Sequence, residues 1–230
     1  DPRYDSSEYG TKLVEQLVGR SGFTFPKSLW AVHDALHVMS ADDDEAIVLD
    51  FYAGSGTTGH ALWELTKRIG GSRRFILVQL PEVLDPDDRD QRDAVRFCDS
   101  LGHPRNIAEL TKERLRRAAE KMKDENPLVA GDLGFRVFKL DSSNIRAWDP
   151  DRDDLDQTLL DSVEHLKQDR TESDVLYELL LKLGLDLCVP IETRTVEAKE
   201  IHAVGGGVLF ACLSENITSD DVEGLAQSIV

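Results

Sequence analysis

Residues 46–59, with the sequence AIVLDFYAGSGTTG, decide the fold that we expect of this chain. The run AIVLDF (46–51) is apolar without alternation, which is typical of a strand buried in a parallel sheet. Glycines at 54, 56 and 59 follow, and HALWELTKRIG (60–70) has the spacing of a helix that ends at a glycine. A glycine-rich turn between a strand and a helix lets the backbone approach a ligand and offers it the unpaired N–H groups of the helix N-terminus.

The segments around this turn repeat the alternation of strand and helix. RRFILVQL (73–80) and LGFRVFKLD (133–141) read as further buried strands, and residues 104–123 have the longest helical pattern. In that helix we expect Ile107, Leu110, Leu115 and Ala118 to face the sheet, and the basic residues Lys112, Arg114, Arg116, Arg117, Lys121 and Lys123 to lie outside. This order predicts an α/β fold with a βαβαβ unit, a parallel sheet and right-handed crossovers. Upstream, the spacing predicts helices over 11–20 and 28–39.

The composition changes after Trp148. An acidic linker, DPDRDDLD (149–156), leads into two predicted helices, 155–168 and 173–183. TRTVEAKEIHAV (193–204) and GGGVLFACL (205–213) read as two strands joined by three glycines, and SDDVEGLAQSIV (219–230) as a capped helix. We therefore expect two domains, 1–150 and 151–230, the second of them a small α+β domain.

Composition excludes several classes of protein. The chain has 230 residues and a net charge of −17, which argues against a protein that holds DNA with its whole surface. The three cysteines, Cys98, Cys188 and Cys212, are far apart and form no CxxC, so we predict neither a disulfide framework nor a metal site. No apolar run reaches the length of a membrane span, and we expect a cytoplasmic protein. The chain does not begin with Met, so a processed or excised piece is as plausible as a complete protein.

The residues of the glycine turn favour S-adenosylmethionine over a dinucleotide as the ligand. Asp50 immediately precedes the turn, where a carboxylate suits an ammonium and a sulfonium and would repel a pyrophosphate. The hydroxyls of Ser55, Thr57 and Thr58 suit a carboxylate or a ribose. A nicotinamide-binding unit usually ends its second strand in Asp or Glu, whereas this chain has Gln79 there, with Glu82 just beyond.

Several motifs also resemble one protein family. DFYAGSGTTGHAL (50–62) resembles the S-adenosylmethionine-binding motif of permuted, beta-class DNA methyltransferases that methylate amino groups. FTFPKS (23–28) resembles the FxFPKP segment of that family, with Ser28 in place of the last Pro. RRFILVQLPE, NIAELTKERLRRAAEK and DLGFRVFKLDSSN resemble, in this order, later segments of the modification subunits of type III restriction–modification systems, which are adenine-specific methyltransferases. The resemblance covers most of residues 8–145 and, more loosely, the C-terminal region.

The resemblance implies a Rossmann-like S-adenosylmethionine methyltransferase sheet, of which the chain carries the cofactor half, followed by the small α+β domain. It assigns cofactor binding to Phe25, Lys27, Asp50, Phe51, Ala53, Gly54, Ser55, Gly56, Thr57, Thr58, Gln79 and Glu82. Phe25 and Lys27 would close over the methionine moiety, with Lys27 paired to its carboxylate. Gln79 and Glu82 would meet the ribose hydroxyls.

The catalytic Asp-Pro-Pro-Tyr motif of the family is not found in the sequence. The opening residues Asp1-Pro2-Arg3-Tyr4 lack the second proline and lie too close to FTFPKS, so we interpret them as a coincidence. We therefore predict no catalytic residue, and no methyl transfer by the chain alone. In the complete enzyme the resemblance implies S-adenosylmethionine as cofactor, with duplex DNA, a second copy of the subunit and a restriction (helicase–nuclease) subunit as partners, and no membrane. Two alternatives remain open: a non-catalytic interaction or dimerisation module, and a fragment of an NAD-dependent oxidoreductase.

Overall fold

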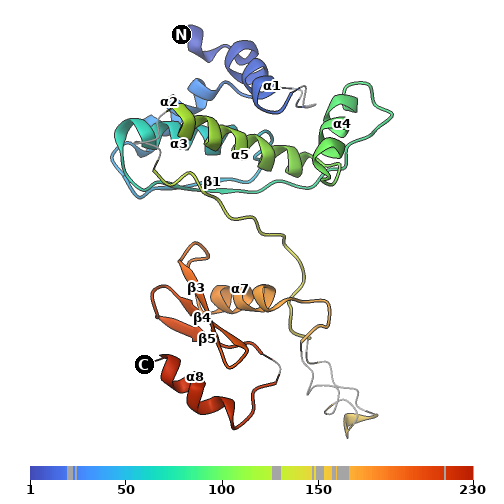
Figure 1. Cartoon of the computed structure of the whole chain (residues 1–230). Coiled ribbons are helices and arrows are strands. Elements are labelled where there is room, and N and C mark those ends of the chain that lie inside the picture. Colours follow the sequence, from blue (N-terminus) through green and yellow to red (C-terminus); the bar gives the residue numbers. More distant parts are fainter. Residues whose placement is uncertain are drawn as a thin grey trace. The chain divides into compact units, whose positions relative to one another are not determined.

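The chain forms two compact units, Asp1–Phe135 and Arg136–Val230, in a computed structural model (Figure 1). The structure describes residues 1–19, 23, 25–125, 131–146, 148, 153–156, 159, 166–214 and 216–229. The sequence predicted a boundary at 150, whereas residues 136–146 already belong to the second unit. No helix among the described residues is both long and apolar enough to span a membrane.

The first unit is mostly helical and contains one short parallel sheet. Its elements are the 3-10 helix η1 (Pro2–Tyr4), the π-helix η2 (Ser7–Lys12), α1 (Leu13–Val18), α2 (Leu29–Ser40), β1 (Ile47–Asp50), α3 (Thr57–Ile69), β2 (Arg74–Leu77), α4 (Arg92–Leu101) and α5 (Ile107–Glu125). The predicted strands at 46–51 and 73–80 and the predicted helices around them are confirmed. Helix α4 was not predicted. It buries Ala94, Val95 and Cys98 and ends at Gly102, whose φ of 67° suits a helix C-cap.

The sheet of this unit has two strands. β1 and β2 run parallel, in register from Ile47↔Arg74 to Asp50↔Leu77, and α3 makes the crossover between them. The third strand predicted at 133–141 is wrong, since the described residues of this segment pair with neither strand. Its apolar residues are divided between the two units: Leu133 packs in the first, whereas Phe138 stacks edge-on against Tyr177 of the second. The structure is therefore α/β with one β–α–β unit, which is less than a Rossmann-like sheet.

Only one face of the sheet is covered. Phe75 and Leu77 of β2 pack against a buried cluster that includes Trp63 and Leu115. The opposite face leaves side chains such as Ile47 and Ile76 more than half exposed, at 55% and 52%. The sequence predicted buried strands, whereas this face of both strands is largely exposed among the described residues.

The second unit is a small α+β structure. Its described elements are α7 (Glu172–Lys182), β3 (Ile191–Val196), β4 (Lys199–Val204), β5 (Leu209–Ala211) and α8 (Asp221–Ile229). The strands form an antiparallel sheet in the order β3-β4-β5, and Leu176 and Leu180 of α7 pack against Val204. The helices predicted at 173–183 and 219–230 are confirmed, whereas most of the helix predicted at 155–168 lies outside the described residues.

One predicted strand of this unit is in fact a hairpin. Residues 193–204 belong to β3 and β4, and the chain turns between them at Glu197 and Ala198, which have φ values of 50° and 66°. A two-residue turn with positive φ at both positions normally carries Asn or Gly. Without these residues the sequence gives no turn signal, so the hairpin was read as a single strand.

Candidate cofactor site

The turn after β1 has the geometry that its glycines allow. Gly54 and Gly56 have φ values of 51° and 74°, in the left-handed region that favours glycine. Gly59 lies one turn into α3, where an added Cβ would press on Leu77 at 3.1 Å and Leu115 at 3.2 Å. The first two glycines therefore shape the turn, and the third lets α3 pack closely on β2 and α5.

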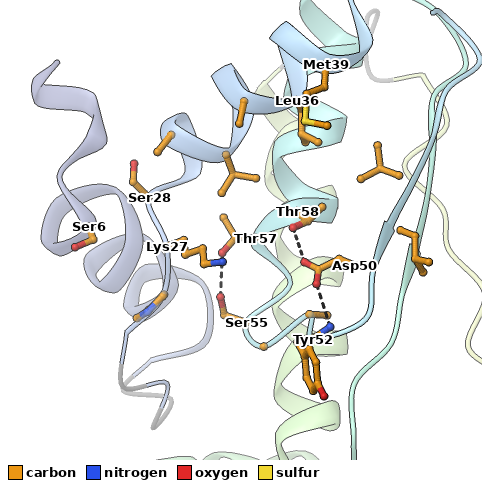
Figure 2. Close-up of a pocket in the computed structure, with 18 of the residues that line it drawn as sticks. Ser6, Lys27, Ser28, Leu36, Met39, Asp50, Tyr52, Ser55, Thr57 and Thr58 are labelled. Carbon is orange, nitrogen blue, oxygen red and sulfur yellow. Dashed lines mark hydrogen bonds between the residues drawn. The ribbon is translucent and has the colours of Figure 1, made fainter.

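Side chains of the turn hydrogen-bond to one another around Asp50 (Figure 2). The Thr58 hydroxyl donates to Asp50 Oδ2 at 2.6 Å, and the backbone N–H of Tyr52 donates to Asp50 Oδ1 at 3.1 Å. Ser55 Oγ and Thr57 Oγ1 lie 3.0 Å apart and share a hydrogen bond. The carboxylate and the hydroxyls thus have fixed positions at the carboxyl end of β1.

Helix α5 holds the backbone of the turn. Thr111 Oγ1 donates to the carbonyl oxygen of Gly54 at 2.5 Å, and Arg114 Nη1 donates to the carbonyl oxygen of Ser55 at 2.9 Å. Arg114 is only 1% exposed, so its predicted place on the outer face of α5 is wrong. The sequence does contain an indication of this burial, because Arg114 lies four residues from both Leu110 and Ala118, which are also buried.

Burial of this cluster changes two pKa values. Desolvation lowers the pKa of Arg114 to about 9. Arg114 Nη2 lies 3.4 Å from Nδ1 of the buried His60, and the pKa of His60 falls well below 6.5, mainly through desolvation and then through the charge of Arg114. His60 is therefore neutral near pH 7, and it lies beside the guanidinium that holds the turn.

A cavity of about 1070 Å³ opens beside the turn. Its walls come from the segment around Pro26, from α2, from β1 and from the turn itself. The predicted cofactor residues that line it are Phe25, Lys27, Asp50, Ala53, Gly54, Ser55, Thr57 and Thr58. Lys27 is exposed, and its side chain extends into the cavity toward the turn (Figure 2). The structure thus brings the FTFPKS segment and the glycine turn to one cavity, although they are distant in sequence.

Four predicted residues are not among those that line the cavity: Phe51, Gly56, Gln79 and Glu82. A Cβ on Gly56 would meet Thr111 Cγ2 at 3.1 Å, so Gly56 faces α5. Gln79 Oε1 accepts a hydrogen bond from the backbone N–H of Gly54 at 2.7 Å and so stabilises the turn. Glu82 and Phe51 are exposed, and Phe51 packs against the ring of Tyr52.

The cavity also contains residues that the sequence did not assign to it. Leu36 and Met39 of α2 form part of its apolar wall, and Met39 is 85% exposed. Tyr4 also lines the cavity and donates a hydrogen bond to Asp34 Oδ2 at 2.7 Å. This bond raises the pKa of the Tyr4 phenol. The residues 1–4 therefore have a defined place beside the cavity.

These features define an α/β protein with a cavity beside β1 and the glycine turn that follows it. No family model matches the chain. Individual proteins do match: the type III restriction-modification enzyme EcoP15I Mod subunit of Escherichia coli is 34% identical over 209 residues, which cover 90% of the chain and 29% of that protein. The EcoPI Mod subunit of Escherichia phage P1 is 28% identical over 233 residues, 99% of the chain and 33% of that protein.

A third relative, the StyLTI Mod subunit of Salmonella typhimurium, is 33% identical over 134 residues, 58% of the chain and 19% of that protein. The chain therefore resembles the modification subunits of type III restriction–modification enzymes, and the resemblance predicted from its motifs is confirmed. The chain spans between 19% and 33% of the length of these three relatives.

Proposed function

We propose that this chain forms the S-adenosylmethionine-binding part of a DNA methyltransferase modification subunit. One observation carries the proposal: Lys27 lines the same cavity as Asp50 and the hydroxyl residues Ser55, Thr57 and Thr58 of the turn. The similarity to three modification subunits supports it independently. We further propose that the complete enzyme methylates the exocyclic amine of adenine in duplex DNA.

The residues of the cavity fit the parts of this cofactor. Lys27 would pair with the carboxylate of the methionine moiety. Both oxygens of Asp50 already accept one hydrogen bond, but each keeps a second lone pair with which the carboxylate would bind the ammonium. Leu36 and Met39 offer apolar surface to the adenine base. When bound, S-adenosylmethionine supplies an electrophilic methyl group.

The role of this chain in methyl transfer would be to bind and orient the donor. Transfer to a base also needs a flipped adenine held in line with the methyl group. In the resembled family an Asp-Pro-Pro-aromatic turn performs that task, and the sequence does not contain this motif. We propose that duplex DNA, a second modification subunit and a restriction subunit are partners of the complete enzyme rather than of this chain by itself.

Titration with two cofactors tests the proposal. The chain should bind S-adenosylmethionine and not NAD in calorimetric titrations, with weak affinity because the cavity is wide and open along β1. Binding of NAD alone would favour an oxidoreductase, and binding of neither would favour an interaction module. Tritiated methyl transfer to mixed-sequence duplex DNA should stay at background with the chain alone. Labelling that the substitution Tyr4→Ala abolishes would show that residues 1–4 are a catalytic turn.

A further inference from the structure

Three potential metal ligands converge in the second unit. Glu172 is the first residue of α7, and Glu200 and His202 lie two residues apart on β4. Residues two apart on a strand share a face, and Val204 on the same face packs against α7. The carboxylate oxygens of both glutamates and a ring nitrogen of His202 all lie within 4.8 Å of one another.

His202 is the buried member of this cluster. Its relative exposure is 8%, and its Nδ1 lies 3.0 Å from Thr193 Oγ1. Its Nε2 is buried, and among the described residues it has no hydrogen-bond partner. The nearest carboxylate oxygen of Glu172 is 3.9 Å away, which is too far for a hydrogen bond. A buried polar atom without a partner is uncommon and indicates that a further group belongs beside it.

The contact with Thr193 is compatible with the form of imidazole that binds metals, since a threonine hydroxyl can accept a hydrogen bond from Nδ1–H as well as donate one. With the proton on Nδ1 donated to the Thr193 hydroxyl, the lone pair is on Nε2, on the side of the two carboxylates. Histidines that bind metal ions usually donate their other ring N–H in this way, which fixes the orientation of the ring.

We propose that Glu172, Glu200 and His202 bind a divalent first-row transition-metal ion, with Zn²⁺ as the representative. One imidazole nitrogen and two carboxylates form a ligand set that suits Zn²⁺ and leaves a fourth position for water. Ligand atoms around a tetrahedral zinc lie about 3.4 Å apart. The three ligand atoms lie within 4.8 Å of one another, and both glutamates are exposed, so their side chains can rotate to reach this spacing.

The charges of neighbouring residues permit a cation at this position. Arg194 pairs with Ile201 in the β3–β4 register and therefore projects from the opposite face of the sheet. Lys199 is the neighbour of Glu200 on β4, so it also projects from the opposite face, and its ammonium lies 3.5 Å from Asp221 Oδ2. The sequence predicted no metal site, because these ligands form no local motif: they come from a helix and a strand that only the fold brings together.

Calorimetric titration of the full chain with ZnCl₂ tests the site. Cys188→Ser and Cys212→Ser in the background remove the two thiols with solvent access, so that no thiolate competes for the ion. We expect one zinc ion per chain. Glu172→Gln should weaken binding by at least about tenfold, since it removes one of three ligands. Glu192→Gln is the matched control: it removes an exposed carboxylate from the opposite face of the same sheet and should leave the affinity unchanged.

Two further variants address the buried histidine. His202→Gln should abolish binding, but this substitution could also disturb packing. Thr193→Val keeps the shape of an exposed side chain and removes only the hydroxyl, and we expect it to weaken binding about tenfold. Zinc affinity that is equal in the wild-type, Glu172→Gln and Glu192→Gln chains would overturn the proposal, as would the absence of binding. Either result would leave the cluster as a histidine beside two glutamates without a metal.

Discussion

Arg114 Nη1 donates a hydrogen bond to the carbonyl oxygen of Ser55 at 2.9 Å, and this bond fixes the glycine turn to helix α5. The hydroxyl of Ser55 lies on the cavity side of the turn, where it meets Thr57 Oγ1. A buried cation therefore holds the backbone of the residue whose side chain faces the proposed cofactor. The turn therefore has its position before any ligand binds.

Arg114→Met should destabilise the first unit by about 2–4 kcal/mol. The substitution keeps most of the side-chain volume but leaves the carbonyl of Ser55 without its charged donor. The free energy of unfolding in urea measures the loss. Arg116→Met, in the same helix with a side chain 43% exposed, is the control and should change stability by less than about 0.5 kcal/mol. Equal effects of both substitutions would contradict the structural role of Arg114.

Gly10→Ala should destabilise the segment that carries Lys27. A Cβ on Gly10 would collide with the backbone carbonyl oxygen of Pro26, so the two segments would have to separate. We expect the free energy of unfolding to fall by about 1–3 kcal/mol and cofactor binding to weaken, because the clash is with backbone and no side chain can move to relieve it. Gly134→Ala is the control, because its Cβ would meet only a movable side-chain oxygen of Asp132. A Gly10→Ala chain as stable as the wild type would show that this contact is not formed.

His60 should make the first unit sensitive to acid. Its pKa in the folded chain is well below 6.5, so only the unfolded chain takes up this proton as the pH falls below 6.5. Stability is therefore lost toward low pH, by up to about 1.4 kcal/mol per pH unit from this group. Denaturation in urea at about pH 7 and about pH 5 should show a smaller difference for His60→Gln than for the wild type. The exposed His37→Gln is the control; a wild-type acid response in His60→Gln would contradict the prediction.

The uncovered face of the β1–β2 sheet should promote self-association. Ile47, Leu49 and Ile76 present exposed apolar side chains there. Light scattering should report a mass that rises with concentration despite the net charge of −17. Ile76→Thr should reduce that rise, since threonine keeps the β-branched shape suited to a strand. A monomer over a wide range of wild-type concentrations would contradict this prediction.

The parts of the fold that the sequence predicted correctly depend on local chemistry. Gly54 and Gly56 determine the turn through their positive φ, which is a local property. Gly59 belongs to the same motif, although its packing contacts are with the distant β2 and α5. The wrong predictions concern segments whose structure is determined by contacts with distant parts of the chain. The apolar residues of 133–141 are as suitable for a strand as those of β2, but Leu133 and Phe138 pack in different units. The hairpin at Glu197 and Ala198 is imposed by strand pairing, since neither residue favours a turn.

The cavity residues show the same difference between features that follow from a local motif and features that depend on distant contacts. Asp50 and the hydroxyls of the turn follow from the motif, and their presence at the cavity needed no knowledge of the rest of the chain. The places of Arg114, Gln79 and Tyr4 could not be predicted in this way. Each depends on a contact with a segment far away in the sequence: Ser55, Gly54 and Asp34, respectively.

A calorimetric comparison of two lysine variants tests the proposal that this cavity binds S-adenosylmethionine through Lys27 and the glycine turn. Lys27→Met removes the cation proposed to pair with the carboxylate of the cofactor, and Lys12→Met removes another exposed lysine, which pairs with Glu8. We predict that Lys27→Met weakens S-adenosylmethionine binding by at least about tenfold, the value of one charge-assisted hydrogen bond, and that Lys12→Met leaves it unchanged. Binding that both variants retain at wild-type strength would contradict the account.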